Sequence, residues 1–323
     1  MNEATTSRRE AIRNSIQLGA AVVTGALLSH QTFAAEQQAK FTMDLVGGAI
    51  GVDASPAELI QLAAKHGFGS VQPNHRHLMK LSNAQLEELH AQLKNDGLVW
   101  GAANMPVEFR KDQQQFDAGM KELSDISKAY KRAGVNRIST WLRPYHESLT
   151  YNQNFKQHTT RLREVAKVVG DQGLRFGVEY VGTKTLWTKS NYSFIHTMQE
   201  TKELITATQA DNMGFVLDSW HWYCAGETRD DLLTLKNKDV VACDLNDAPA
   251  GIPVDQQVDN RRELPATTGT IDVKSFLSAL VEIGYDGPIR AEPFNQPLNE
   301  MDNDAACMAT SKAISKAFAM VGV

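Results

Sequence analysis

Residues 175–181 read Arg-Phe-Gly-Val-Glu-Tyr-Val, and residues 213–218 read Met-Gly-Phe-Val-Leu-Asp. Both are short, nearly continuous apolar runs, which is typical of parallel strands that are buried on both faces. The residues between them, around 193–208, favour a helix. A strand, a helix and a second strand in this order predict one unit of a parallel sheet.

The same unit repeats along the rest of the chain. Two helices are expected to start at capping sequences, Ser55-Pro-Ala-Glu58 and Ser82-Asn-Ala-Gln85, in which the third residue after the serine can bond back to it. The other predicted helices are 112–133, 155–172, 227–236, 272–283 and 304–321. The other predicted strands are 41–45, 69–73, 99–104, 137–142, 240–245 and 288–293. Eight strands that alternate strictly with helices predict a single (β/α)8 TIM barrel.

The composition narrows the class of protein. The chain has 323 residues, of which 42% are hydrophobic, and this is enough for the core of a large barrel. Its net charge is −5, without a long basic run, which argues against a nucleic-acid partner. Cys224, Cys243 and Cys307 are too few for a disulfide framework. We expect buried free thiols, although one bridge remains open.

Residues 1–35 are not expected to belong to the barrel, which we place at 36–323. Arg8 and Arg9 precede an uncharged and mostly apolar stretch at 18–28, and Thr32-Phe-Ala-Ala35 then offers small residues for a signal peptidase, with cleavage expected after Ala34. This order is typical of a cleavable signal peptide, and the apolar stretch is short for a membrane span. The paired arginines favour the twin-arginine route. We expect a periplasmic protein without stable membrane insertion, with a membrane anchor as the alternative.

Four consecutive predicted strands end in acids. These acids are Glu179, Asp218, Asp244 and Glu292. The carboxyl ends of barrel strands meet at one face, where the active sites of such barrels form. Like charges held close together raise one another's pKa unless a cation neutralises them, and oxygen ligands suit Mg²⁺ or Mn²⁺. The sequence therefore predicts one divalent cation held by these acids. The alternative is that they cap loops or pair with arginines.

Residues near these acids are candidates for substrate binding. His221 could donate to a substrate hydroxyl, and Trp222 could cover the apolar face of a sugar, but both could equally be packing residues. Trp141, after the fourth strand, could also shape the substrate site. Lys184 and Arg262 lie in the long segments after the fifth and seventh strands. Either could contact a substrate oxygen, whereas Lys184 could also face water and Arg262 could form an ion pair.

The motifs around these acids resemble the xylose isomerase-like barrel family. They are Val178-Glu179-Tyr180, Leu217-Asp218-Ser-Trp-His221, Leu245-Asn246-Asp247-Ala248, Gly284-Tyr285-Asp286-Gly287 and Ala291-Glu292. The resemblance covers the chain after residue 35 and is strongest over 174–295. It implies one divalent metal bound through Glu, Asp, His and Glu, and Glu179, Asp218 and Glu292 match three of these positions. Asp244 stands where the family has histidine, which would make the site all-carboxylate.

The family includes sugar phosphate isomerases and epimerases, ketose 3-epimerases and inosose dehydratases. The resemblance therefore implies a metal-dependent isomerase or epimerase of a keto-sugar or related polyol, in which Glu179 and Glu292 transfer protons through an enediolate. A lyase or dehydratase on the same scaffold is one alternative, because elimination starts with the same proton abstraction. A non-catalytic carbohydrate-binding barrel is the other. Association into a homo-oligomer is common in the family and is expected here only on that ground.

Overall fold

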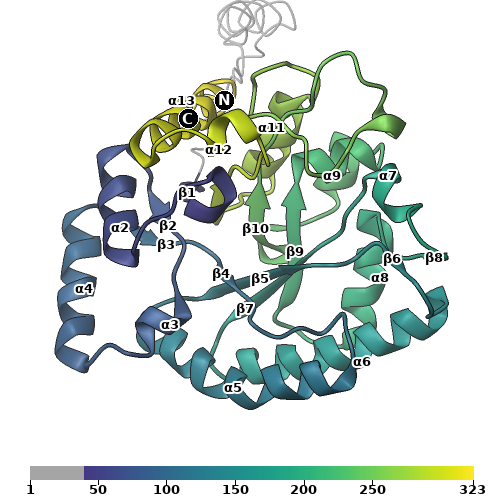
Figure 1. The fold of residues 1–323 in the computed structure, drawn as a ribbon, viewed down its shortest axis with the longest axis horizontal. Helices are drawn as coiled ribbons and strands as arrows, with labels where there is room; N and C mark the ends of the chain where they lie inside the picture. The colour runs from purple at the N-terminus through teal and green to yellow at the C-terminus, as the bar shows by residue number, and fades with distance from the viewer. Residues whose placement is uncertain (1–39) are drawn as a thin grey trace, which may run out of the picture. The chain divides into compact units, whose positions relative to one another are not determined.

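The computed structural model describes residues 40–323 (Figure 1). The predicted signal peptide lies outside the described residues, so its cleavage, the export route and the periplasmic location stay predictions. Within 40–323, no helix has the length and apolar character needed to cross a bilayer. The three cysteines carry free thiols, as expected.

The main sheet contains nine parallel strand segments. They are β1 (Thr42–Leu45), β2 (Ser70–Val71), β3 (Val99–Trp100), β4 (Ala103–Asn104), β5 (Arg137–Trp141), β7 (Arg175–Glu179), β9 (Met213–Asp218), β10 (Val240–Asp244) and β11 (Pro288–Arg290). Their order is β3-β2-β1-β11-β10-β9-β7-β5-β4. The two ends of this order, β3 and β4, are consecutive in the chain, and only Gly101 and Ala102 separate them. The sheet therefore curls until its ends meet, which gives a TIM-barrel-like fold.

The strand predicted at 99–104 is thus two segments, and this is a correction to the expected continuous strand. The first segment pairs with β2 and the second pairs with β5. The carboxylate of Asp44 lies against the backbone of Gly101, where a Cβ atom would come within 2.2 Å of the carboxylate Oδ1. Only glycine leaves room for this buried acid. Burial raises the pKa of Asp44 to about 6.

The eight predicted helices all form on the outside of the sheet. They are α2 (Pro56–Lys65), α4 (Asn83–Asn95), α5 (Gln113–Arg132), α6 (Tyr151–Gly170), α8 (Met198–Thr208), α10 (Arg229–Leu233), α11 (Val273–Glu282) and α13 (Asn303–Ala319). In Figure 1, α2, α4, α5, α6 and α8 follow one another around the sheet. Both predicted capping boxes form: Ser55 with Glu58, and Ser82 with Gln85.

Short elements that the sequence does not predict lie mostly in the loops after the strands. The short helices are α3 (His75–Leu78), α7 (Lys184–Trp187), α9 (Ser219–Cys224), α12 (Gln296–Asn299), η1 (Gly47–Ile50), η2 (Asn237–Asp239) and η3 (Val254–Gln256). In addition, β6 (Tyr145–His146) pairs antiparallel with β8 (Tyr192–Ser193) and so joins the loops after β5 and β7. Elements of two to six residues are too short to show a hydrophobic period.

Small apolar side chains fill the inside of the sheet below the strand ends. Ala102, Val216 and Ala242 form a separate buried cluster there. Side chains alternate along a strand, so residues two positions further point to the same side. Asp218 follows Val216 by two residues, and Asp244 follows Ala242 by two. The alternation therefore places these acids above the apolar cluster, at the carboxyl ends of the strands.

Candidate active site

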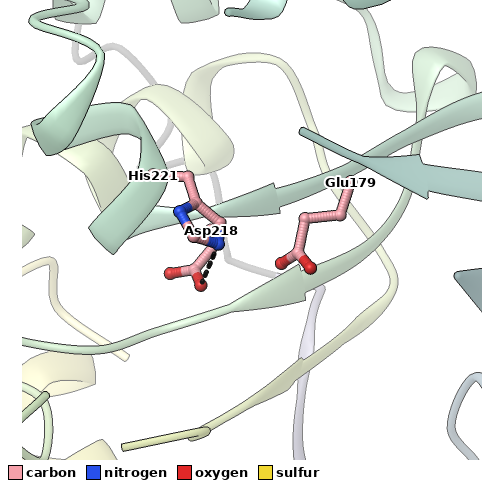
Figure 2. Close-up of side chains that lie close together, drawn as sticks. All are labelled: Glu179, Asp218 and His221. Carbon is pink, nitrogen blue, oxygen red and sulfur yellow. Dashed lines mark ion pairs between the residues drawn. The ribbon is translucent and has the colours of Figure 1, made fainter. Parts of the chain in front are cut away.

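Strand register brings the predicted acids together. Asp218 lies opposite Asp244, and Asp244 lies opposite Arg290 on the next strand. One oxygen from each of Asp218, Asp244 and Glu292 lies within 4.8 Å of the others. The same spacing relates Glu179, Asp218 and His221, whose side chains meet in Figure 2. The four strand-end acids thus form one cluster.

The cluster faces a cavity of about 600 Å³ at the mouth of the barrel. This volume is in the range of small-molecule sites. On the side of the acids the cavity is lined by Glu179, His221, Asp259, Arg262, Arg290 and Glu292. The lining also includes Trp141 and polar residues from the loops and strands of the first half of the barrel, namely Gln72, Asn104, Arg110, Ser139 and Thr140, together with apolar residues such as Val46, Ala49 and Met105. The cavity therefore combines charged, polar and apolar groups.

Asp244 is held by an arginine that the sequence interpretation did not identify. Arg290 donates from Nε to Oδ1 of Asp244 and from Nη2 to Oδ2, the latter at 2.9 Å. Asp244 is fully buried, and the Arg290 side chain is 12% exposed. The signal was present in the sequence, because Arg290 precedes Glu292 by two residues on a strand and so points to the same side.

Arg262 binds the second acid. Its Nη1 donates to Oδ2 of Asp218 at 2.8 Å and lies 3.5 Å from Oε2 of Glu292. Its Nη2 donates to Oδ1 of Asp259 at 2.9 Å. The guanidinium is almost fully buried and also lies over the rings of Trp220 and Phe294, at 5.5 and 4.9 Å. The sequence left open whether Arg262 contacts a substrate oxygen or forms an ion pair. The ion pair forms, and Arg262 also lines the cavity.

His221 is a buried, neutral imidazole. Its Nε2 lies 3.2 Å from Nη2 of Arg262. A guanidinium can only donate, so Nε2 accepts and the ring proton resides on Nδ1. Burial, together with the charge of Arg262, lowers the pKa of His221 to about 3. Nδ1 has no hydrogen-bond partner among the described residues, so it retains the donor capacity expected of this histidine.

The cluster holds more carboxyl groups than the two arginines can neutralise. Burial, reinforced by Asp244, Asp218 and Glu292, raises the pKa of Glu179 well above its usual value. Burial also raises the pKa of Asp218 to about 7, although Arg262 opposes the shift. Oε1 of Glu179 is buried and has no hydrogen-bond partner in residues 40–323. An orphaned buried oxygen beside other carboxylates fits a divalent cation, so the residues present are compatible with one.

Two predicted substrate-binding residues, Lys184 and Trp222, do not line this cavity. Lys184 is about half exposed and sits 3.7 Å from Asp255, so it faces water as the alternative allowed. Trp222 is buried, donates to the carbonyl oxygen of Thr228 and packs on Phe276. Both residues follow the strands after which the sequence places them. The direction of each side chain, however, depends on a short helix, α7 or α9, that the sequence does not predict.

A different aromatic residue reaches the cavity. Trp141 lines it and is 40% exposed. Its ring lies 4.5 Å from the guanidinium of Arg110, which Glu108 holds through a two-point ion pair. Arg110 lies in the loop before α5, outside any periodic element, so the sequence does not predict that it lines the cavity. Trp141, which was predicted as a residue that could shape the substrate site, thus lines the cavity.

Comparison with known proteins identifies the family. The pattern of the xylose isomerase-like TIM barrel family matches residues 60–311. The chain is 22% identical to inosose isomerase of Bacillus subtilis over 214 residues, which are 65% of this chain and 74% of that protein. It is 27% identical to 3-dehydroshikimate dehydratase of Pseudomonas aeruginosa over 135 residues, which are 42% of this chain but only 20% of the dehydratase.

Solved structures share the fold over most of the chain. A xylose isomerase domain protein from Alicyclobacillus acidocaldarius has a TM-score of 0.75 at 26% identity, covering 88% of this chain and all of that one. The IOLI protein with a bound zinc atom has a TM-score of 0.71 at 20% identity, with 86% and 98% covered. D-psicose 3-epimerase from Clostridium cellulolyticum has a TM-score of 0.65 at 19% identity, with 84% and 95% covered. The chain belongs to the xylose isomerase-like TIM barrel family, and its curated relatives are enzymes.

Proposed function

We propose that this enzyme is a divalent-metal-dependent isomerase or epimerase of a keto-sugar or related polyol, and that it works by proton transfer through an enediolate. The observation that carries the proposal is Glu179, a buried acid with an unpartnered oxygen, beside a second acid, Glu292, in the same cavity. The similarity to inosose isomerases supports the same reaction class.

Glu179 and Glu292 are the proposed proton-transfer groups. Both line the cavity, and burial raises the pKa of both. A carboxylate with a raised pKa is a stronger base and can return the proton near neutral pH. One of the two removes the proton next to the substrate ketone, and the other delivers a proton to the enediolate. In an epimerase this delivery occurs on the opposite face.

Glu179, Asp218 and Glu292 would hold the cation, with Mn²⁺ or Mg²⁺ favoured by the oxygen ligands. When bound, the cation supplies positive charge beside the substrate carbonyl oxygen, which eases removal of the neighbouring proton. Asp244 belongs to the same cluster, but both of its oxygens already accept from Arg290.

The remaining cavity residues would position the substrate. Neutral His221 keeps an Nδ1–H without a partner among the described residues, and Trp141 offers an exposed ring to the apolar face of a sugar. Arg262 lines the cavity but donates all of its N–H groups to neighbouring residues, so its contribution is charge. We also propose the export predicted from the arginine pair at 8–9. An exported enzyme would meet unphosphorylated sugars, so a free or glycosidic keto-sugar is the proposed substrate class.

A dehydratase is the second candidate, and the similarity to 3-dehydroshikimate dehydratase is the observation that favours it. Elimination begins with the same removal of a proton next to a carbonyl. The two reactions differ in whether the substrate then loses a hydroxyl as water or regains a proton. Product analysis by mass therefore separates them.

The test is proton exchange with solvent. The metal content of the purified chain is measured first, and a panel of unphosphorylated keto-sugars is then incubated in D₂O and followed by NMR. We expect exchange at the carbon next to the ketone, and a loss of about 10²–10⁴-fold in rate for Glu179→Gln and for Glu292→Gln. Glu227→Gln is the matched control, because Glu227 is mostly buried and its pKa is raised too, but it does not line the cavity.

Wild-type exchange rates in both Glu179→Gln and Glu292→Gln would refute the assigned roles. Tight binding of a sugar without exchange or turnover, unchanged by chelation, would leave a carbohydrate-binding barrel as the better account.

A further inference from the structure

The pair formed by Asp244 and Arg290 differs from the other contacts in the cluster. The two residues are direct neighbours in strand register, so the backbone itself places the guanidinium beside the carboxylate. Both carboxylate oxygens accept a hydrogen bond from this one side chain. Two parallel bonds between arginine and a carboxylate are among the strongest charged contacts in proteins. The charge of Asp244 is therefore neutralised by Arg290.

None of the other three acids forms such a two-point pair with one arginine. Glu179 has an oxygen without a hydrogen-bond partner among the described residues. Arg262 lies 3.5 Å from Glu292 and divides its guanidinium between Asp218 and Asp259. Asp218 also accepts at Oδ1 from the backbone N–H of Trp220 and from Nδ2 of Asn246. What distinguishes Asp218 from Asp244 is therefore the absence of a two-point pair with one arginine, not a larger number of free acceptor sites.

A cation within reach of Asp244 would also lie close to Arg290. One oxygen of Asp244 is within 4.8 Å of oxygens from Asp218 and Glu292, while its two oxygens are both bonded to the guanidinium. Two positive charges held this close in a buried site repel strongly. Coordination by Asp244 would therefore place the cation beside the guanidinium that is already bonded to both of its oxygens.

We propose that Arg290 neutralises Asp244 and withholds it from the cation site, so that Glu179, Asp218 and Glu292 are the ligands and Arg290 limits cation affinity. The inference rests on the proposed metal dependence, but it concerns a different property, namely which acids bind the metal and how tightly. Arg290 is thus a positioning residue for Asp244, and its guanidinium replaces the metal as the partner of that acid.

The test is Mn²⁺ binding by isothermal titration calorimetry on chelator-stripped protein at one fixed pH, without any substrate. Arg290→Met frees the Asp244 carboxylate, so we expect Mn²⁺ to bind at least about tenfold more tightly than in wild type. The double variant Asp244→Asn/Arg290→Met removes the pair without changing the net charge. For this variant we expect a Kd within about threefold of wild type, because no ligand is lost.

Asp218→Asn is the positive control, because it removes an assigned ligand, and it should weaken Mn²⁺ binding by at least about tenfold. Circular dichroism checks that each variant is folded. If Arg290→Met does not fold, Arg290→Lys replaces it. Lysine is a point charge without the two-point geometry, so a gain of about threefold is then expected.

The outcomes separate the inference from the proposed function. A double variant that loses Mn²⁺ binding about tenfold would make Asp244 a ligand and overturn the inference, as would an Arg290→Met variant that binds no more tightly than wild type. If wild type binds Mn²⁺ and the variants behave as expected but no sugar exchanges protons, the inference stands and the proposed function fails. If wild type binds no Mn²⁺, both fail.

Discussion

Asp218 and Asp244 end adjacent strands, lie opposite each other in register and each accept hydrogen bonds from an arginine. The two arginines reach them by different routes. Arg290 comes from the neighbouring strand and directs two donors at Asp244. Arg262 comes from the long segment after β10, 44 residues from Asp218 in sequence, and its donors also reach Asp259.

The difference shows that an arginine on a neighbouring strand bonds one acid, whereas an arginine in a loop bonds residues from several elements. Arg262 also donates from Nε to the carbonyl oxygen of Asp259, and it contacts His221. We therefore expect Arg262 to matter most for the stability of the barrel mouth, and Arg290 to matter most for its cation affinity.

The largest expected effect is that of Arg262→Met. Removing the guanidinium leaves Asp218 buried without its cationic partner, and breaking a buried pair in this way costs about 3–5 kcal/mol. Urea unfolding at neutral pH measures the loss. Arg261→Met is the matched control, because this neighbouring arginine is exposed, and it should change the unfolding free energy by less than about 0.5 kcal/mol. Similar values for both variants would contradict the importance assigned to Arg262.

A smaller effect is expected for a buried acid that lies outside the cluster. Glu227 accepts from the hydroxyl of Tyr180 and from the backbone N–H of Met198. Burial raises the pKa of Glu227 to about 7. Below its unfolded pKa of about 4.5 the group is protonated in both states. As the pH rises toward 7, only the unfolded chain releases the proton, so the folded state loses stability.

Glu227→Gln removes this loss. The variant should therefore gain up to about 3 kcal/mol over wild type between pH 5 and pH 8. Thermal melts at the two pH values provide the check, with the difference in Tm growing toward pH 8. A difference of the same size at pH 5 and pH 8 would show that the ionisation of Glu227 is not responsible.

The smallest expected effect is that of Asp259→Asn, which tests whether Arg262 depends on its second acid. The variant keeps an oxygen that can accept from Arg262 but loses the negative charge. Hydrogen bonds to charged groups are worth about 1.5–3 kcal/mol, so we expect the free energy of unfolding, measured by urea unfolding, to fall by about 1–2 kcal/mol. Asp255→Asn, at an exposed position paired with Lys184, is the control. A loss as large as that of Arg262→Met would mean that Asp259, rather than Asp218, is the main partner of Arg262.

The sequence by itself determined the strand and helix order and the ring of acids. Buried parallel strands leave a continuous apolar run, and the carboxyl ends of barrel strands meet at one face, so Glu179 and Asp218 could be placed together without coordinates. The same alternation could also have placed Arg290, since it lies two residues before Glu292. Pairing of acids with arginines was among the stated alternatives, and in the described residues Arg262 pairs with Asp218 and Glu292 while Arg290 pairs with Asp244.

Only the tertiary structure decided the rest. The buried carboxylate of Asp44 lies against Gly101 at the break between β3 and β4, and the contacts of Arg262 depend on the course of the long segment after β10. Trp222 turned into the packing against Phe276, and Trp141 reached the cavity instead. The physical reason is range: strand periodicity is repeated every two residues and is visible locally, whereas the direction of a loop side chain depends on contacts between segments far apart in the chain.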